Sequence, residues 1–229
     1  MRVFEDRRDA GRRLAAALAD DAGLAGAGGG RRGPGEVPQR LVVLAIPRGG
    51  LPVGAEVARA LDAEFDVVVV RKLRTPQNPE LGFGAMASDG HVEIDQELVH
   101  RLRLTPQQVS AEIDDRRQLI ERRLELYRSV TPLVDLVGAL VIVVDDGIAT
   151  GGTAREACAL ARRMGAERVV LAVPVAPRRT AAELASVADR VLVLSEPAEF
   201  LAVGRAYKDF GQLDDASSLE ILRELGARN

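Results

Sequence analysis

The chain has 229 residues, of which 47% are hydrophobic and 28% are charged, and its formal net charge is −3. This length suits one α/β domain with additional elements or two small domains, and it is sufficient for a large hydrophobic core. The charges are nearly balanced and give no basic excess for duplex nucleic acid, so we expect no nucleic-acid partner.

The single cysteine, Cys158, excludes an intrachain disulfide and offers no cysteine-based metal cluster, as is typical of a reducing cytosol. The stretch MRVFEDRRDAGRR is charged and no apolar segment follows it, so we expect no signal peptide. No apolar run approaches the roughly 18 residues of a membrane span. Together these features predict a cytoplasmic protein without a membrane partner.

The first third of the chain predicts a helix, a linker and a βαβ unit. Residues 6–21 carry apolar side chains at helical spacing, which predicts an amphipathic helix. Residues 22–38 are dense in glycine and proline and predict a linker, because no strand precedes them as a dinucleotide fingerprint requires. The apolar runs 41–46 and 65–73 enclose a helical segment at 51–63, and this order predicts a parallel sheet.

Residues 74–91 contain five prolines and glycines and predict a long loop with a hairpin. A loop of this length in a compact domain usually indicates a functional segment. Thr105, Pro106 and Gln108 then form a helix start with a capping box, and the helix continues to about residue 129.

The second half of the chain alternates strands and helices. We expect strands at 139–146, 168–176 and 190–195, and helices at 151–164, 180–190 and 215–226. The whole pattern predicts an α/β fold with a mainly parallel sheet of about five strands flanked by helices, a lid or hairpin insertion and a small C-terminal hood. The predicted divisions are an N-terminal helix and linker at 1–38, an α/β core at 39–195 with an insertion at 74–104, and a hood at 196–229.

Ligands of parallel sheets bind at the carboxyl ends of the strands, where this sequence places PRGG, RKLR and DDGIATGGT. Residues 149–153 lie between a strand and a helix, and their glycine-rich turn predicts a phosphate site formed by backbone N–H groups. Thr150 and Thr153 add hydroxyl donors. The segment has no lysine and is therefore no Walker A loop, and an ordinary strand-to-helix turn is the alternative.

Asp145 and Asp146 come directly before this loop. Adjacent residues of a strand point to opposite faces, so both carboxylates can serve one ligand only if the strand breaks, which Gly147 permits. Two carboxylates would repel a phosphate, but they accept hydrogen bonds from sugar hydroxyls, with Mg²⁺ nearby to offset their charge. The pattern therefore favours a sugar phosphate, and a solvated or helix-capping acidic pair is the alternative.

The stretch VIVVDDGIATGGT resembles the binding motif for 5-phosphoribosyl 1-pyrophosphate (PRPP) of the type I phosphoribosyltransferases, and its DDxxATGGT form is most similar to the adenine-type enzymes. The order of elements from about 40 to 195 resembles that fold. The resemblance implies that the two aspartates hold the ribose hydroxyls and Mg²⁺, that the loop holds the 5-phosphate, and that PRGG and RK hold the pyrophosphate. The implied PRPP-binding residues are Pro47, Arg48, Gly49, Gly50, Arg71, Lys72, Asp145, Asp146, Gly147, Ala149, Thr150, Gly151, Gly152 and Thr153.

The activity implied by the resemblance is a pentosyl transfer from PRPP to a nitrogen acceptor, with release of pyrophosphate. Arg48, Lys72, Asp145 and Asp146 would be the catalytic residues, and a lid at 74–85 would exclude water. Enzymes of this family that act on 6-oxopurines carry an aspartate at the position of Ala149, so the alanine argues against such an acceptor. The implied partners are small molecules, and because family members are often dimers, a homodimer is implied as well.

Two other functions stay open from the sequence: a non-catalytic regulator that senses PRPP or nucleotides, and an unrelated phosphosugar-binding protein. The acceptor side is less defined, since Phe200, Tyr207 and Phe210 can form either a stacking platform for a heterocycle or a small satellite core under the C-terminal helix. The segments FEDRRDAGRRLA and VGRAYKDF are similar to a bacterial branch of phosphoribosyltransferase-domain proteins, and this likeness implies no particular acceptor. His91 and His100 have no partner pattern and predict structural or solvated side chains.

Overall fold

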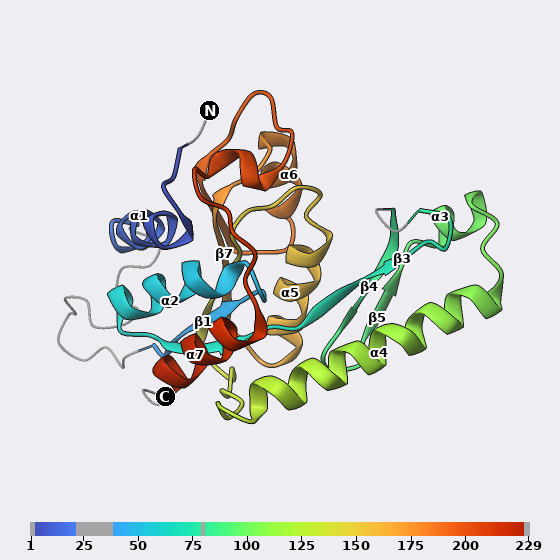
Figure 1. The fold of residues 1–229 in the computed structure, drawn as a ribbon, viewed down its shortest axis with the longest axis horizontal. Helices are drawn as coiled ribbons and strands as arrows, with labels where there is room; N and C mark the ends of the chain where they lie inside the picture. The colour runs from blue at the N-terminus through green and yellow to red at the C-terminus, as the bar shows by residue number, and fades with distance from the viewer. Residues whose placement is uncertain (1–2, 22–38, 79–80, 227–229) are drawn as a thin grey trace.

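The computed structural model describes residues 3–21, 39–78 and 81–226 (Figure 1). The predicted linker at 22–38 lies outside these residues. A five-stranded parallel sheet forms the centre, in the order β2-β1-β6-β7-β8. Its strands are β1 (Leu41–Ala45), β2 (Glu64–Val67), β6 (Leu140–Val144), β7 (Arg168–Val175) and β8 (Arg190–Ser195). The predicted α/β fold with a parallel sheet is confirmed.

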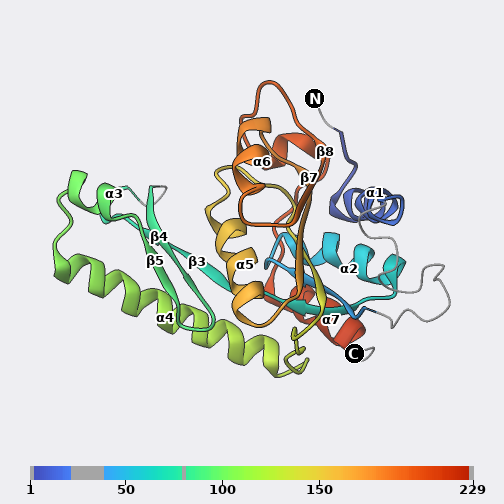
Figure 2. The ribbon, with the colours of Figure 1, turned by 180° about the vertical axis from the view of Figure 1, so that it is seen from behind.

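Helices cover both faces of this sheet, as Figures 1 and 2 show from opposite sides. One layer contains α1 (Arg7–Ala19), α2 (Gly50–Leu61) and α7 (Asp215–Gly226), and the other contains α5 (Gly152–Arg163) and α6 (Arg178–Leu184). Side chains alternate along β1, so that Val43 and Ala45 belong to the core with α1 and α2, whereas Val42 and Leu44 belong to the core with α5. Burial on both faces explains why each strand reads as a continuous apolar run.

Residues 70–128 form an arm that projects from the central sheet (Figures 1 and 2). It consists of the antiparallel strands β3 (Val70–Arg74), β4 (Gly82–Ala87) and β5 (Val92–Ile94), the short helix α3 (Gln96–Arg101) and the long helix α4 (Pro106–Arg128). The capping box at the start of α4 is present, with Thr105 and Gln108 each accepting from the other's backbone. Strand β4 lies within the segment 74–91, which was predicted as a long loop with a hairpin, and the turn from β4 to β5 forms such a hairpin at its end.

The predicted strand 65–73 is wrong as a single element, because the chain changes sheets within it. Strand β2 ends at Val67, the N–H of Val68 donates to the carbonyl of Ala45, and β3 then pairs with β4 in the arm. Residues 67–70 are all buried at this junction. A continuous apolar run therefore gave no local sign that the hydrogen-bonding partner changes.

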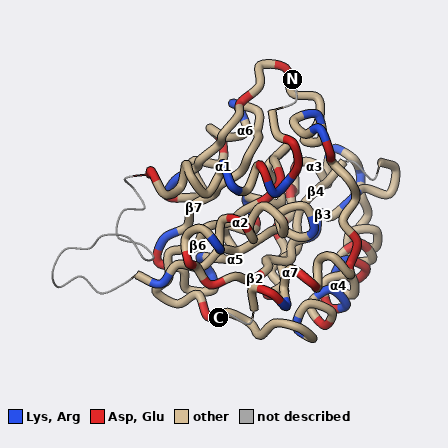
Figure 3. The backbone as a smooth tube through the Cα atoms, turned by 60° about the vertical axis from the view of Figure 1, so that its left-hand side comes forward, with Lys and Arg blue, Asp and Glu red and all other residues tan. Residues whose placement is uncertain are grey.

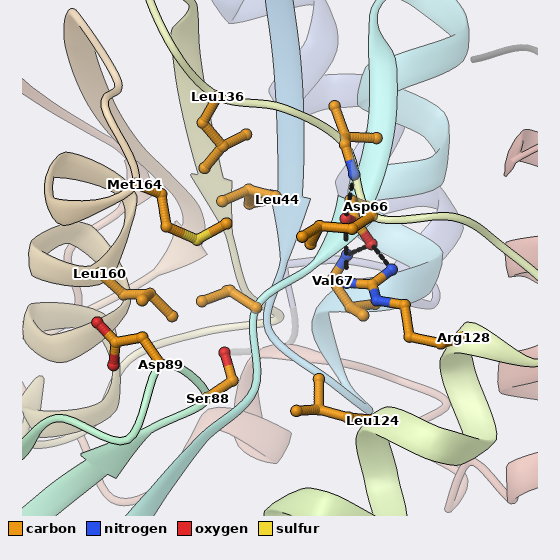
Figure 4. Close-up of a pocket in the computed structure, with 13 residues that line it drawn as sticks. Leu44, Asp66, Val67, Ser88, Asp89, Leu124, Arg128, Leu136, Leu160 and Met164 are labelled. Carbon is orange, nitrogen blue, oxygen red and sulfur yellow. Dashed lines mark hydrogen bonds and ion pairs between the residues drawn. The ribbon is translucent and has the colours of Figure 1, made fainter.

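An ion pair connects the arm to the central sheet. Asp66 of β2 is 1% exposed and accepts hydrogen bonds from Arg128 of α4 at 2.6 and 3.1 Å. The backbone N–H groups of Val67 and Val134 donate to the same carboxylate, at 2.7 and 3.0 Å. These contacts lie beside a mostly apolar cavity of about 420 Å³ between β1, β2, α4 and α5 (Figure 4).

The first described residues lie alongside the segment that precedes α7. The N–H groups of Val3 and Phe4 donate to the carbonyl of Ala206, and those of Lys208 and Asp209 donate back to residues 4 and 5. The short 3₁₀ helix η2 (Val203–Ala206) leads into this pairing. Among the helices of the described ranges, none is long and apolar enough to cross a membrane.

Candidate functional site

The acidic pair lies in a loop beyond the end of β6. The strand ends at Val144, so the prediction of a strand continuing to residue 146 and breaking at Gly147 is wrong. The last backbone hydrogen bond between β6 and the chain after β1 runs from the N–H of Ile46 to the carbonyl of Val144, and the carbonyl of Ile46 then accepts from Gly50 in the PRGG turn. Gly147 has another role, since a Cβ there would lie only 2.6 Å from Val203 and 2.7 Å from Val175.

The two carboxylates have different surroundings. Asp145 lines a cavity in front of the strand ends, whereas Asp146 accepts a hydrogen bond of 2.7 Å from Nε of Arg7. Burial raises the pKa of Asp145 well above its ordinary value, and the adjacent Asp146 raises it further. Burial also raises the pKa of Asp146, but Arg7 opposes this shift.

The cavity beside Asp145 has a volume of about 460 Å³ and lies between the strand ends and the arm. It brings together five residues that the sequence predicted for PRPP binding, namely Pro47, Arg71, Lys72, Asp145 and Thr153. Its other lining residues are Ile46, Val70, Arg74, Arg116, Leu119 and Arg123. Five of the eleven side chains are therefore basic and one is acidic, which favours an anionic ligand.

Two of these arginines were missed by the sequence analysis. Arg116 and Arg123 are seven positions apart on α4, with Leu119 between them, and this spacing places all three on one helix face. The spacing was visible in the sequence. However, charges of both signs lie along α4 (Figure 3), so no single face of the helix is marked as facing a ligand.

Arg71 of β3 is a partly buried member of this basic group. Burial lowers its pKa below the ordinary value, and the positive charges of the neighbouring Arg123 and Arg116 lower it further. An anion in the cavity would offset this repulsion and compensate the lost hydration. Lys72 lies beside it, and its aliphatic stem covers Gly82, where a Cβ would come within 2.4 Å of the stem.

The loop at 149–153 leads directly into α5, which begins at Gly152. Gly151 precedes the helix with φ of +81°, a backbone conformation that favours glycine, and no side chain caps the helix. Ala149, Thr150 and Gly152 are exposed. The uncapped helix N-terminus beside an exposed loop has the local geometry of an anion site.

The PRGG turn packs closely against the acidic pair, and its Pro47–Arg48 peptide bond is cis. A Cβ on Gly49 would lie 2.1 Å from Oδ2 of Asp146, and one on Gly50 would lie 2.6 Å from the carbonyl oxygen of Val144. The glycines therefore permit the turn to approach the end of β6. Arg48 is exposed, and its Nη1 lies 3.5 Å from Asp215 of α7.

The three aromatic residues of the predicted hood lie around one small hydrophobic cluster. Tyr207 is buried between Phe4 and Phe210, with ring centroids at 5.5 and 5.0 Å, and its hydroxyl donates to the carbonyl of Asp146. Phe200 packs against the same cluster and also lines a cavity near residues 195–206. The small satellite core that the sequence offered as an alternative is therefore present, but it packs against the N-terminal segment and not under the C-terminal helix.

The remaining candidate residues lie apart from this site. His91 and His100 are exposed. Cys158 is buried in α5, and burial raises the pKa of its thiol to about 12. Over the ranges that the structure describes, no three His, Cys, Asp or Glu side chains group together as metal ligands.

Comparison with known proteins shows the family. The model of the phosphoribosyl transferase domain matches residues 38–205, which is more than half of the chain. The chain belongs to this phosphoribosyl transferase family. The resemblance of VIVVDDGIATGGT to that family is thereby confirmed.

Relatives of this phosphoribosyl transferase domain protein occur in bacteria. Over 217 residues it is 45% identical to proteins of two Mycobacterium tuberculosis strains, CDC 1551 and H37Rv, that carry the provisional name phosphoribosyl transferase. The match covers 94% of this chain and 45% of each relative, so the chain spans less than half their length. The crystal structure of TT1426 from Thermus thermophilus is similar with a TM-score of 0.77 and 39% identity, covering 99% of this chain and 100% of that one.

Proposed function

We propose that this protein transfers the ribose 5-phosphate of PRPP to a nitrogen acceptor and releases pyrophosphate, as a pentosyltransferase of the glycosyltransferase class. The observation that carries the proposal is the single cavity in which Asp145 and Thr153 face Arg71, Lys72 and the arginines of α4. PRPP has a diol between two phosphate-bearing ends. The cavity offers a carboxylate between a helix N-terminus and a cluster of cations.

The parts of PRPP correspond to separate elements of the site. The loop at 149–153 and the start of α5 hold the 5-phosphate, as the uncapped helix supports. Asp145 and Asp146, held close by Gly147, hold the ribose hydroxyls. Arg71 and Lys72 of β3 bind the pyrophosphate, together with the PRGG turn (Pro47, Arg48, Gly49 and Gly50).

Mg²⁺ fits this set of donors as an ion carried by the substrate. Mg²⁺ is commonly bound through one or two carboxylates together with substrate phosphates and water, and Asp145 supplies a carboxylate that lines the cavity. Asp146 lies directly beside it. When bound, Mg²⁺ would offset the negative charge of the pyrophosphate.

The chain's own residues support the departure of pyrophosphate. The bond between C1 of the ribose and the pyrophosphate oxygen breaks, and the electron pair leaves with pyrophosphate, whose charge Lys72 and the arginines stabilise. The acceptor nitrogen forms the new bond to C1 and loses its proton to solvent. Arg74, at the end of β3, lines this cavity, and the predicted lid at 74–85 would limit the access of competing water.

The acceptor is a flat nitrogen heterocycle that is not a 6-oxopurine. Ala149 is exposed at the loop and offers no carboxylate to a purine. Phe200, Tyr207 and Phe210 remain candidates on the acceptor side, of which Tyr207 and Phe210 lie near Asp146. A cytoplasmic location and a homodimer also belong to this proposal, by the same family resemblance.

Removal of both carboxylates tests the site. Asp145→Asn combined with Asp146→Asn should abolish calorimetric binding of PRPP with Mg²⁺, because the diol and the metal lose their ligands. Asp114→Asn with Glu183→Gln is a matched control, since it removes two carboxylates that are 58% and 50% exposed and whose partner arginines do not line the cavity. Unchanged PRPP affinity in the first double variant, with the fold verified by its melting temperature, would refute the assignment.

The regulator is the second candidate, and turnover separates it from the enzyme. The protein is incubated with PRPP, Mg²⁺ and a panel of nitrogen heterocycles, and pyrophosphate release is measured. Release with one heterocycle, lost in the Asp145→Asn/Asp146→Asn variant, supports the transferase. Tight PRPP binding without release for any member of the panel favours the regulator.

A further inference from the structure

Arg7 connects the N-terminal helix to the acidic pair. Its Nε donates to Oδ2 of Asp146 at 2.7 Å, and its Nη1 donates to the carbonyl of Gly211 at 2.8 Å. The guanidinium lies over the ring of Phe210 at 3.8 Å from the centroid. The side chains of Arg7 and Asp146 are only 12% and 13% exposed.

These contacts fix the guanidinium in one orientation. The hydrogen bond to Gly211 and the stacking on Phe210 restrain its plane, so that Nε presents a single donor to one carboxylate oxygen. The carboxylate of Asp146 also packs closely against the PRGG turn, because a Cβ on Gly49 would lie only 2.1 Å from its Oδ2. The carboxylate is therefore held between the PRGG turn and Arg7.

Phe210 contacts both Arg7 and Tyr207, although 36% of it is exposed. One face of its ring lies against Arg7, and Tyr207 stacks on it with centroids 5.0 Å apart and an interplanar angle of 29°. Tyr207 in turn donates its hydroxyl to the backbone carbonyl of Asp146. Two side chains from outside the strand–loop motif, one near each end of the described chain, thus contact the same aspartate.

We propose that Arg7 is a positioning residue that holds the Asp146 carboxylate for the ribose hydroxyls, with Phe210 as the support of Arg7. The inference rests on the proposed function, because it takes the ribose of PRPP as the ligand of Asp146. It adds to the site a residue that lies 139 positions away from Asp146 in the sequence. The ribose-binding part of the site is then incomplete without α1.

The test compares three probes that share different parts of PRPP: PRPP itself with Mg²⁺, ribose 5-phosphate, and inorganic pyrophosphate. Arg7→Ala should weaken PRPP and ribose 5-phosphate at least tenfold in calorimetry, because Asp146 loses the group that orients it. Pyrophosphate has no ribose and should bind within twofold of the wild type. Arg7→Lys should recover part of the loss, since it restores the charge but not the restrained donor geometry.

Arg12→Ala is the control on the same helix. The side chain of Arg12 is 60% exposed, and its Nη2 lies 4.0 Å from Oδ1 of Asp9. This variant should leave all three affinities unchanged. A merely structural role of Arg7 would lower the melting temperature and the affinity for all three probes alike. PRPP binding by Arg7→Ala that equals or exceeds the wild-type affinity would overturn the inference. Tighter binding would show that Arg7 competes with the substrate for Asp146. If Arg7→Ala does not fold, Arg7→Lys decides, and full wild-type affinity for both ribose probes would reject the proposal.

These outcomes are separable from failure of the proposed function. If the wild-type protein binds neither PRPP nor ribose 5-phosphate, both the proposed function and the role of Arg7 are rejected. If the wild type binds PRPP and the Arg7 variants bind it equally well, only the role of Arg7 is rejected.

Discussion

Asp145 shows at the scale of one residue how a ligand site reduces stability. Its carboxylate is partly buried beside Asp146, and burial raises its pKa well above the ordinary value. A raised folded-state pKa means that the folded protein binds this proton more tightly than the unfolded chain does. The carboxyl group therefore has no unfavourable effect below its unfolded pKa, and it destabilises the fold increasingly as the pH rises from there through the folded pKa.

Asp145→Asn should consequently stabilise the ligand-free protein at neutral pH. The amide keeps an oxygen for the N–H of Asp146, which donates to Oδ1 of Asp145 at 2.8 Å, and it removes the buried charge. We expect the melting temperature to rise by about 3 °C at pH 7, which corresponds to roughly 1 kcal/mol for a chain of this size. The gain should disappear near pH 3, below the ordinary aspartate pKa of about 3.9.

Thermal melts between pH 3 and pH 8 measure this effect, with the exposed Asp115→Asn as the control that should show no gain. A melting temperature at pH 7 below that of the wild type would contradict the expectation. The same variant should bind PRPP poorly, which would show that the carboxylate is retained for binding at the expense of stability.

At the scale of elements, a buried ion pair adds to the apolar contacts that attach one helix to the sheet. Arg128 is close to the end of α4, and Asp66 lies on β2 with 1% of its side chain exposed. Figure 4 shows the pair beside the cavity between the arm and the sheet. Because the carboxylate is buried, it needs the guanidinium more than an exposed partner would.

Arg128→Met should lower the free energy of unfolding by about 3 kcal/mol, since Asp66 keeps two backbone donors but loses its cation. Urea denaturation measures the loss. Arg117→Ala removes an exposed pair with Asp114 on the same helix and should change stability by less than about 0.5 kcal/mol. The double variant Asp66→Asn/Arg128→Met should recover part of the loss. If the double variant loses as much free energy of unfolding as the two single variants together, the two side chains are not coupled.

Local sequence patterns predicted the elements but not their partners. The buried strands, the Thr105 capping box and the glycine-rich loop each have a signature within a few residues, and each of them is present in the structure. The run 65–73 changes sheets, and β6 ends at Val144 because the neighbouring chain turns away after Ile46. Neither event has a signature in the affected segment, because strand pairing is set by distant residues.

The same limit applies to the site. Asp145, Thr153, Arg71 and Lys72 were predicted because each follows a strand, and the structure brings them to one cavity. The arginines of α4 reach that cavity from a helix with both charges along its length. Arg7 meets Asp146 only through the packing of α1, so neither contact can be read from a motif.

At the scale of the whole molecule, charge is distributed unevenly. The formal net charge is −3, yet one cavity of about 460 Å³ contains four arginines and a lysine. Attraction between this local positive potential and an anion is screened by salt, whereas the net charge alone would repel the anion.

The association rate of pyrophosphate should therefore fall by about tenfold between 20 and 200 mM salt, although the protein is acidic overall. Stopped-flow measurements at several salt concentrations test this expectation. Arg116→Gln with Arg123→Gln should flatten the dependence, while Arg178→Gln, which removes an arginine with 85% exposure outside the cavity, should not. A rate that rises with salt would show that the net charge dominates.

The pairing of residues 3–5 with residues 206–209 has a consequence for the order of events during synthesis. A ribosome releases residues 3–7 long before it releases Tyr207 and Phe210, so the N-terminal segment emerges without the partners that it has in the folded protein. The strands and the loop that follows Asp146 can assemble earlier. The contacts of Arg7 with Phe210 and Gly211 can form only after those two residues have been translated, so a shorter nascent chain can fold its sheet without yet completing its site.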